Sequence, residues 1–194
     1  MLMSPSNDPA DALVETMLGL DTLWTLPRTG WLLRGIQPCE SIAEHSYGVA
    51  MVAMLLVDRL RQQGVALDGE RVLRMALVHD APEAALGDVP MPRKNPQLKQ
   101  ALTALEDDIA QELLPAEAVA SWRESQAKET PESRLVKAAD KIQMMIKVLA
   151  YERAGRGHLE QFWQNPDNFN DAGFDVARDV FDAICRRAGR RRPS

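Results

Sequence analysis

The stretch that organises this chain is Val78-His79-Asp80-Ala81-Pro82-Glu83-Ala84-Ala85-Leu86-Gly87-Asp88. Apolar residues precede it, and His79 and Asp80 stand side by side where the apolar run ends. Glu83 follows within one helical turn, and Gly87 then introduces Asp88. Burying such ionisable groups is unfavourable unless they pair with one another or bind a metal. The stretch therefore predicts a functional site at the end of a buried helix, with partners supplied from elsewhere in the chain.

The overall composition is that of an ordinary water-soluble globular protein. The chain has 194 residues, of which 45% are hydrophobic and 26% charged, and this suits one domain with a substantial core. A net charge of −5 argues against a general nucleic-acid-binding protein. The longest apolar run, residues 49–57, is too short to cross a bilayer, and the polar N-terminus is unlike a signal peptide. The two cysteines form no metal-binding or disulfide pattern, which favours a cytoplasmic location.

The hydrophobic periodicity predicts an all-α fold, because no segment shows a convincing two-residue alternation. We expect a disordered lead over residues 1–9, one compact multi-helix domain over 10–188 and a solvated basic tail over 189–194. The helices are expected over residues 9–26, 41–64, 68–80, 83–86, 97–114, 116–128, from 131 onward and 174–187. Residues 28–35 are expected to form a connector, because they are too rich in glycine for a helix.

Local signals mark the two longest helices. Residues 41–44 have the form of a capping box, and Thr130 followed by Pro131 is a strong helix start. The helix that begins after Ser41 is apolar on nearly every face, which predicts a central buried position.

Two histidines and two aspartates are expected on three core helices. They are His45, His79, Asp80 and Asp140. This mixed nitrogen and oxygen set suits one divalent metal ion, with Mn, Co, Fe or Ni favoured over Zn and with Mg also open. The absence of sulfur ligands argues against a closed structural zinc site. Taken singly, His45 could be a satisfied core histidine, and Asp140 could pair with Lys137 or Lys141. The joint pattern favours the metal site.

The order of these residues resembles the HD superfamily of metal-dependent phosphohydrolases. Finer motifs resemble its 5′-deoxynucleotidase branch: Arg28-Thr29-Gly30-Trp31, Glu44-His45-Ser46, His79-Asp80-Ala81-Pro82-Glu83-Ala84, Gly87-Asp88-Val89-Pro90-Met91-Pro92-Arg93-Lys94 and Ala139-Asp140-Lys141. The resemblance extends roughly over residues 12–155. It implies a helical HD domain that forms a homodimer, releases phosphate from deoxyribonucleoside 5′-monophosphates and selects against ribonucleotides.

Glu83 is the expected catalytic residue. It follows His79 by four residues and Asp80 by three, so a continued helix would turn it toward the same pocket. There it would transfer a proton to or from the reacting groups. Pro82 bends the chain at this point and leaves the aim of Glu83 open, and a role in stabilising the N-terminus of a short helix is the alternative.

Four further residues are expected to bind the substrate. Arg28 would hold phosphate through paired donors, with Arg34 as the alternative, and Lys94 would add a point charge. The resemblance assigns Asp88 to the sugar 3′-hydroxyl group and Trp31 to the deoxyribose face. On composition alone, Trp31 would be a core residue.

Three other interpretations stay open from the sequence. One is a different HD chemistry, such as a nucleotide pyrophosphohydrolase, a phosphodiesterase or a di-iron oxygenase, although residues 81–139 contain no histidine for a second metal. Another is a non-catalytic nucleotide-binding module that keeps a metal for stability, which the presence of Glu83 disfavours. The last is a helical scaffold with coincidental ligands.

Overall fold

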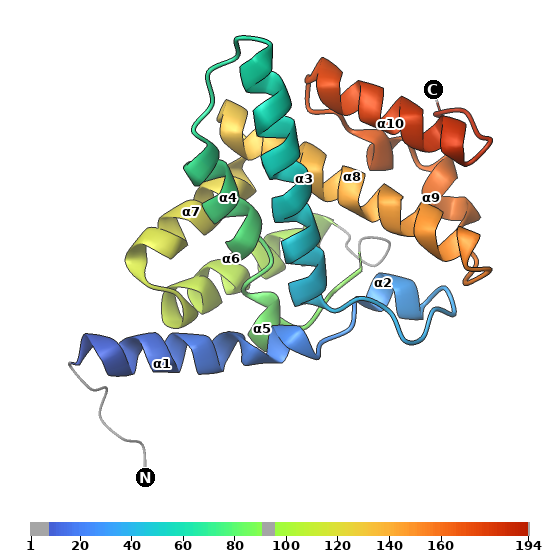
Figure 1. Ribbon diagram of the computed structural model, residues 1–194. Coiled ribbons are helices and arrows are strands. Elements are labelled where there is room, and N and C mark those ends of the chain that lie inside the picture. The colour runs from blue at the N-terminus through green and yellow to red at the C-terminus, as the bar shows by residue number, and fades with distance from the viewer. Residues whose placement is uncertain (1–7, 91–95, 194) are drawn as a thin grey trace.

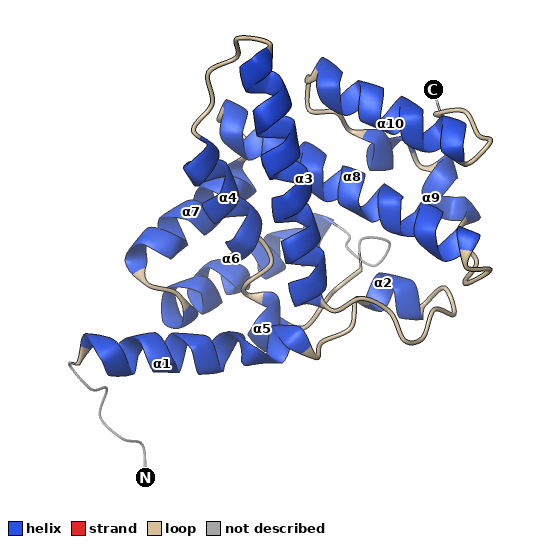
Figure 2. Cartoon of the chain, viewed as in Figure 1, coloured by secondary structure: helices blue, strands red, loops and turns tan. Residues whose placement is uncertain are grey.

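The computed structural model describes residues 8–90 and 96–193 (Figure 1). These residues form α1 (Pro9–Leu20), η1 (Asp21–Trp24), α2 (Thr29–Leu32), α3 (Ile42–Gln62), α4 (Gly69–Val78), α5 (Glu83–Leu86), α6 (Pro96–Leu113), α7 (Ala116–Ala127), α8 (Pro131–Arg153), α9 (Glu160–Gln164), η3 (Pro166–Phe169) and α10 (Asp175–Arg187). The described residues contain no strand (Figure 2), so the all-α prediction is confirmed. None of the described helices is both long and apolar enough to cross a membrane.

The two longest helices, α3 and α8, form the centre of the molecule. Each begins with a capping box, made by Ser41 with Glu44 in α3 and by Thr130 with Ser133 in α8. These boxes satisfy backbone N–H groups that have no partner within the helix. α4 packs against both helices, and α10 covers the other side of α8 (Figure 1). The main core lies between these elements.

A smaller core supports the chain where α4 ends. It consists of Ala81, Ala110, Leu114, Val119 and Trp122. Ala81 follows Asp80 directly, and the other four residues lie in α6, in α7 and between them. The segment that carries His79 and Asp80 is therefore anchored on a packed surface.

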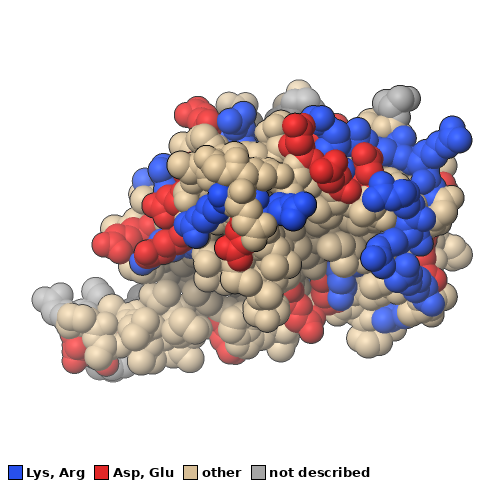
Figure 3. Space-filling model, turned by 45° about the horizontal axis from the view of Figure 1, so that its top comes forward, with Lys and Arg blue, Asp and Glu red and all other residues tan. Residues whose placement is uncertain are grey.

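The first helix is shorter than the sequence predicts, and its apolar side chains are exposed. α1 ends at Leu20, and the 3₁₀ helix η1 continues to Trp24. No residue of α1 is buried, and its apolar side chains are 51% exposed at Met17 and 65% at Leu13. The surface at the lower left of Figure 3, formed by α1, carries few charged side chains. The apolar stripe of this helix thus faces solvent.

Two other expectations about the helices need correction. Residues Thr29–Leu32 form the short helix α2 instead of a connector, with backbone hydrogen bonds from Leu32 to Arg28 and from Leu33 to Thr29. Gly30 is compatible with this turn, because neither its φ angle nor its surroundings require a glycine. α3 is central, but it is not buried on nearly every face, because Tyr47 is 66% exposed and Leu55 60%.

The C-terminal arginines pair with acidic residues. Arg190 contacts the carboxylates of Glu152 and Glu160 at 3.3 and 2.8 Å, and its guanidinium lies 5.0 Å from the Trp163 ring centre. Arg190 is therefore held against α8 and α9, while Arg191 is exposed, and the solvated basic tail over residues 189–194 stays a prediction. Basic side chains gather on the side of the molecule formed by α9 and α10 (Figure 3).

Candidate metal centre and active site

His45 is fully buried in the first turn of α3. Its Nδ1 atom lies 2.7 Å from the Gln143 side-chain oxygen on α8. Its Nε2 atom is buried, has no hydrogen-bond partner among the described residues, and faces Asp140, whose Oδ1 atom is 3.4 Å away. His45 therefore directs its Nε2 atom toward Asp140 on α8.

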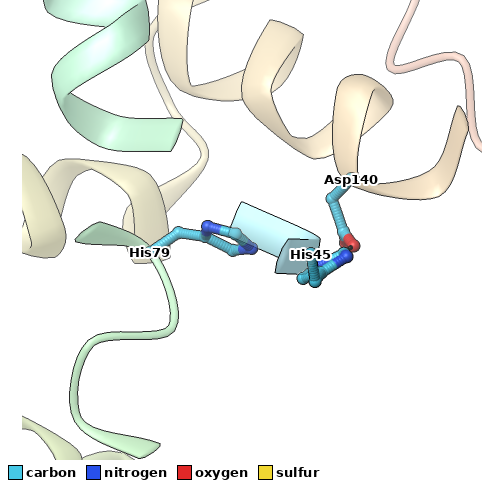
Figure 4. Close-up of side chains that lie close together, drawn as sticks. All are labelled: His45, His79 and Asp140. Carbon is cyan, nitrogen blue, oxygen red and sulfur yellow. Dashed lines mark ion pairs between the residues drawn. The ribbon is translucent and has the colours of Figure 1, made fainter. Parts of the chain in front are cut away.

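His79 caps the C-terminus of α4 and turns its ring toward His45 (Figure 4). The Nδ1 atom lies 2.8 Å from the backbone oxygen of Ala76, which fixes the ring through its own helix. The Nε2 atom is buried and, like that of His45, has no hydrogen-bond partner. One ligand atom each from His45, His79 and Asp140 lies within 4.8 Å of the others.

Two carboxylates complete the cluster. The Oδ2 atom of Asp80 lies 3.3 Å from His79 Nε2 and 3.6 Å from His45 Nε2. The two oxygens of Asp140 have different contacts. Oδ2 accepts a hydrogen bond of 2.7 Å from Lys137, and Oδ1 faces His45. All four predicted metal ligands are thus within one small volume.

Burial and charge shift the ionisation of these groups in opposite directions. Burial alone would raise the pKa of Asp80, but His79, His45 and Arg28 hold that pKa far below its usual range. Burial would likewise raise the pKa of Asp140, and Lys137 and His45 hold it well below normal. Burial lowers the pKa of His79, but the neighbouring Asp80 outweighs this effect and raises it. The two aspartates are therefore ionised, as metal ligands must be.

The donor set fits a divalent metal ion. Buried polar atoms normally have partners, so two imidazole nitrogens without one, directed at two carboxylates, require an explanation. Each histidine uses Nδ1 for a hydrogen bond within the protein, which is how metal-binding histidines are usually oriented. The arrangement can hold one ion through His45, His79 and Asp140, with Asp80 adjacent.

Arg28 connects this cluster with the other predicted site residues. Its NH1 atom lies 3.4 Å from Asp80 Oδ2. Burial lowers the pKa of Arg28, but the carboxylates of Asp80, Asp140, Asp88 and Glu83 together raise it. Glu83 and Asp88 are therefore near the same guanidinium. Arg34, by contrast, pairs with Gln161 at 2.7 Å on α9, so the geometry favours Arg28 as the phosphate-binding arginine.

Glu83 and Asp88 are fixed by backbone contacts. The Glu83 N–H donates to the Asp80 carbonyl oxygen at 3.0 Å, so the turn at Pro82 keeps both residues in one unit. Asp88 accepts a 2.7 Å hydrogen bond from the backbone N–H of Thr29, the first residue of α2. This bond joins the loop after α5 to the helix that follows Arg28.

Trp31 does not lie where the resemblance implied. It is 2% exposed, it stacks on Phe162 with ring centres 4.9 Å apart, and its Nε1 donates to Glu40. A ring covered in this way has no free face for a sugar, so direct contact with deoxyribose is contradicted by the burial. Lys94, the other predicted substrate contact, lies outside the described residues.

The sequence reasoning missed several residues that contact the cluster. Lys137 holds Asp140, and Gln143 holds His45. Gln126 donates to the His79 carbonyl oxygen at 3.0 Å, and with Lys137 it lines a hollow of about 90 Å³ beside His79, Asp80 and Asp140. Helical spacing could have found Lys137 and Gln143, which lie one turn before and after Asp140.

Comparisons with known proteins identify the family of this chain. The HD domain family model matches residues 20–172. The 5′-deoxynucleotidase hdd1 of Schizosaccharomyces pombe is 36% identical over 156 residues, which cover 74% of this chain and 75% of that protein. The crystal structure of the PH0347 protein of Pyrococcus horikoshii is 34% identical, with a TM-score of 0.80 over 90% of this chain and 99% of that one.

A further crystal structure bears a chemical name. It comes from Magnetospirillum magnetotacticum, is named a predicted metal-dependent phosphohydrolase, and is 26% identical with a TM-score of 0.65 over 97% of this chain and 99% of that one. The resemblance read from the sequence motifs is confirmed by these matches, which extend over most of the chain. The protein belongs to the HD-domain family.

Proposed function

We propose that this protein is a metal-dependent 5′-deoxynucleotidase, which hydrolyses the phosphate ester of deoxyribonucleoside 5′-monophosphates. The observation that carries the proposal is the pair of buried, unpartnered Nε2 atoms of His45 and His79 beside two ionised aspartates and Arg28. The 36% identity to a 5′-deoxynucleotidase supports the choice of substrate class.

His45, His79, Asp80 and Asp140 would hold one divalent ion, which would offset the negative charge of the phosphate and help to activate the attacking water. The mixed nitrogen and oxygen set favours Mn, Co, Fe or Ni over Zn, with Mg also open. Lys137 neutralises the second oxygen of Asp140 and so keeps the other oxygen directed at the site.

The remaining side chains divide the work on the substrate. Arg28 binds the phosphate, because its guanidinium presents parallel donors beside the metal ligands. Glu83 moves a proton, either from the attacking water or to the leaving 5′-oxygen. Lys94 remains a predicted phosphate contact. Arg28 stays charged because nearby carboxylates raise its pKa, namely those of Asp80, Asp140, Asp88 and Glu83.

Asp88 is the proposed contact to the sugar 3′-hydroxyl group. One of its oxygens is held by Thr29, which leaves the other for a ligand. Trp31 acts on this contact indirectly, since it anchors α2 in the core and thereby places Thr29. We propose that selection against ribonucleotides depends on how closely this loop encloses the sugar.

A phosphate-release panel tests the proposed function. The purified protein is loaded separately with Mn²⁺, Co²⁺, Ni²⁺, Fe²⁺, Zn²⁺ and Mg²⁺, and phosphate release is measured from deoxy- and ribonucleoside mono-, di- and triphosphates. We expect the fastest release from deoxyribonucleoside 5′-monophosphates. Faster release from triphosphates or ribonucleotides, or release that needs no metal, would contradict the proposal.

We also propose a homodimer that acts on small molecules in the cytoplasm, without a nucleic-acid or membrane partner. The exposed apolar side chains of α1 and the hollow of about 380 Å³ that they line with Trp24 support a second copy of this chain as the occupant. An isolated 12-residue helix is only marginally stable in water, so a helix without buried residues gains from such a contact. Light scattering on the purified protein measures its mass directly.

A further inference from the structure

Glu40 is a buried carboxylate that none of the proposed chemical steps uses. It is 4% exposed and lies two residues before α3. Its Oε1 atom accepts a 2.8 Å hydrogen bond from Trp31, and its Oε2 atom accepts one of 2.9 Å from the Gln143 side-chain amide. The Lys147 ammonium group lies 3.5 Å from Oε2 and offsets the buried charge. Burial of a carboxylate is unfavourable, so these contacts raise the question of what Glu40 does for its neighbours.

The hydrogen-bond directions in this network allow one assignment. A carboxylate accepts only, so the amide NH₂ of Gln143 must face Glu40 and the amide oxygen must face His45. Since that oxygen also accepts only, His45 must carry its proton on Nδ1, which lies 2.7 Å away. The lone pair of His45 is then on Nε2, the atom that faces Asp140.

The space for Gln143 is provided by a glycine on the opposite helix. Gly48 lies one turn after His45, and a Cβ atom there would stand 2.9 Å from Gln143 Cγ and 3.0 Å from its Nε2. Such distances are too short for ordinary contacts, so any larger residue would displace the amide. The crossing of α3 and α8 is therefore shaped around this side chain.

His79 obtains the same orientation in a different way. Its Nδ1 atom donates to the Ala76 carbonyl oxygen, three residues earlier in the chain. A backbone carbonyl can only accept, so the tautomer of His79 is set locally. The tautomer of His45 depends instead on contacts between distant parts of the chain. Gln143 is 98 positions from His45 and 103 positions from Glu40.

We propose that Glu40 and Gln143 are positioning residues that set the tautomer of His45 and thereby determine its ability to bind the metal. The carboxylate of Glu40 fixes which way the Gln143 amide is turned, because it can only accept a hydrogen bond. The same carboxylate also binds Trp31, which lies in α2, the helix that follows Arg28. This inference rests on the proposed function only in taking His45 as a metal ligand.

The hydrogen bonds from Glu40 through Gln143 to His45 form a relay, and Glu40→Gln tests it with almost no change in side-chain shape. The new amide oxygen can keep the bond from Trp31, so its NH₂ group faces Gln143. Gln143 must then turn its oxygen toward position 40 and its NH₂ toward His45, which forces Nδ1 to accept and moves the proton to Nε2. We expect ¹⁵N NMR of the metal-free protein to show this tautomer change at His45. Affinity for Mn²⁺, followed by EPR of the free ion, should fall by about 10–100-fold.

Internal and matched controls separate the relay from a general loss of structure. The NMR signals of His79 and of the exposed His158 should be unchanged in Glu40→Gln. Glu152→Gln is the matched variant, because Glu152 also accepts a hydrogen bond from a tryptophan Nε1 atom, at 2.9 Å, but does not contact the histidines. It should leave both the His45 tautomer and the Mn²⁺ affinity unchanged.

A second variant covers the case in which Glu40→Gln fails to fold. Gln143→Met keeps the approximate size and removes the acceptor, so His45 should populate both tautomers and bind Mn²⁺ more weakly. An Nδ1–H tautomer and an unchanged Mn²⁺ affinity in either folded variant would overturn the inference. A wild-type protein that binds no divalent metal would instead contradict the proposed function, and the tautomer change in the metal-free variant would still support the relay.

Discussion

The interior around His45 and the outer face of α1 depart from the usual distribution of residues in opposite ways. Around His45, polar side chains are buried, including Glu40 and Gln143 at 4% and 6% exposure. On α1, apolar side chains are exposed, with Leu13 at 65% and Leu18 at 62%. Both arrangements are unfavourable in an isolated chain, because polar groups lose water and apolar groups face it.

The difference lies in how completely each region supplies its own partners. In the interior, Glu40, Gln143 and the Nδ1 atoms of both histidines make hydrogen bonds. Within the described part of the chain, the Nε2 atoms of His45 and His79 make none. Those two atoms point to a ligand that is small and cationic. α1 has no buried residue, and the surface it presents to solvent is extended and apolar, which is the chemistry of the proposed second copy. The two burial patterns therefore support different proposals, a metal site in the interior and an association surface on α1.

The largest effect is expected from removing a metal ligand. His79→Ala deletes one of the two Nε2 atoms that lack a hydrogen bond, and phosphate release should fall by at least about 100-fold. This loss should exceed that caused by replacing a residue that only hydrogen-bonds to a metal ligand. Metal analysis of the purified variant should show reduced content. His158→Ala, at an exposed histidine, is the control and should behave like wild type. Full metal content and activity in His79→Ala would remove the basis for the metal site.

Glu83→Gln separates chemistry from metal binding within the same region. The amide keeps the shape but cannot transfer a proton, so kcat should fall by about 10²–10⁴-fold while metal content stays unchanged. Steady-state kinetics and metal analysis check the two parts. Glu70→Gln, at a mainly exposed position of α4, is the matched control. If kcat were unchanged, Glu83 would have only the role of stabilising α5.

Replacing a tryptophan in each region compares them directly. Trp31→Ala should destabilise the protein by about 3–5 kcal/mol, because a buried ring leaves a cavity and an unpaired Glu40 oxygen. Trp24→Ala, at a residue 61% exposed, should change the free energy of unfolding of the monomer by less than about 0.5 kcal/mol. Urea denaturation measures both, and equal losses would show that the exposure of η1 is wrong.

Adding metal should stabilise the polar interior. At a free Mn²⁺ concentration of 100 times Kd, a site present only in the folded protein adds about 2.7 kcal/mol to the free energy of unfolding. Thermal melts with and without Mn²⁺ measure this gain. The gain should be absent in His79→Ala, and a gain of equal size in that variant would assign the stabilisation to another site.

The smallest effect on the folded monomer is expected on α1. Leu18→Glu changes an exposed side chain, so the stability of the monomer should change by less than about 0.5 kcal/mol, while the dimer should dissociate. Light scattering over a concentration series measures the mass. Val65→Glu, at an exposed residue outside the helices, is the control and should stay dimeric. A monomeric wild type would contradict the dimer prediction.

Much of the fold could be predicted because its signals are local. The capping box at Ser41 and the Thr130-Pro131 start act within one helical turn, and both predicted helix starts are confirmed. The adjacency of His79 and Asp80, and their spacing to Glu83, are also contained in one short segment. The motif order brought His45 and Asp140 into the same expected site, and the geometry agrees.

What the sequence determined by itself was most of the longer helices, the starts of α3 and α8, and the residue types gathered for metal chemistry. The short helices α2, α9 and η3 were not among the expected elements. The tertiary structure alone decided that Trp31 is buried while Trp24 is exposed, that α1 turns its apolar stripe to solvent, and that Glu40 reaches His45 through Gln143. The physical reason is range, because capping and periodicity act between neighbours in the chain. Burial and hydrogen-bond direction depend instead on which helices cross. Here the hydrogen bonds of Gln143 connect residues about a hundred positions apart in the sequence.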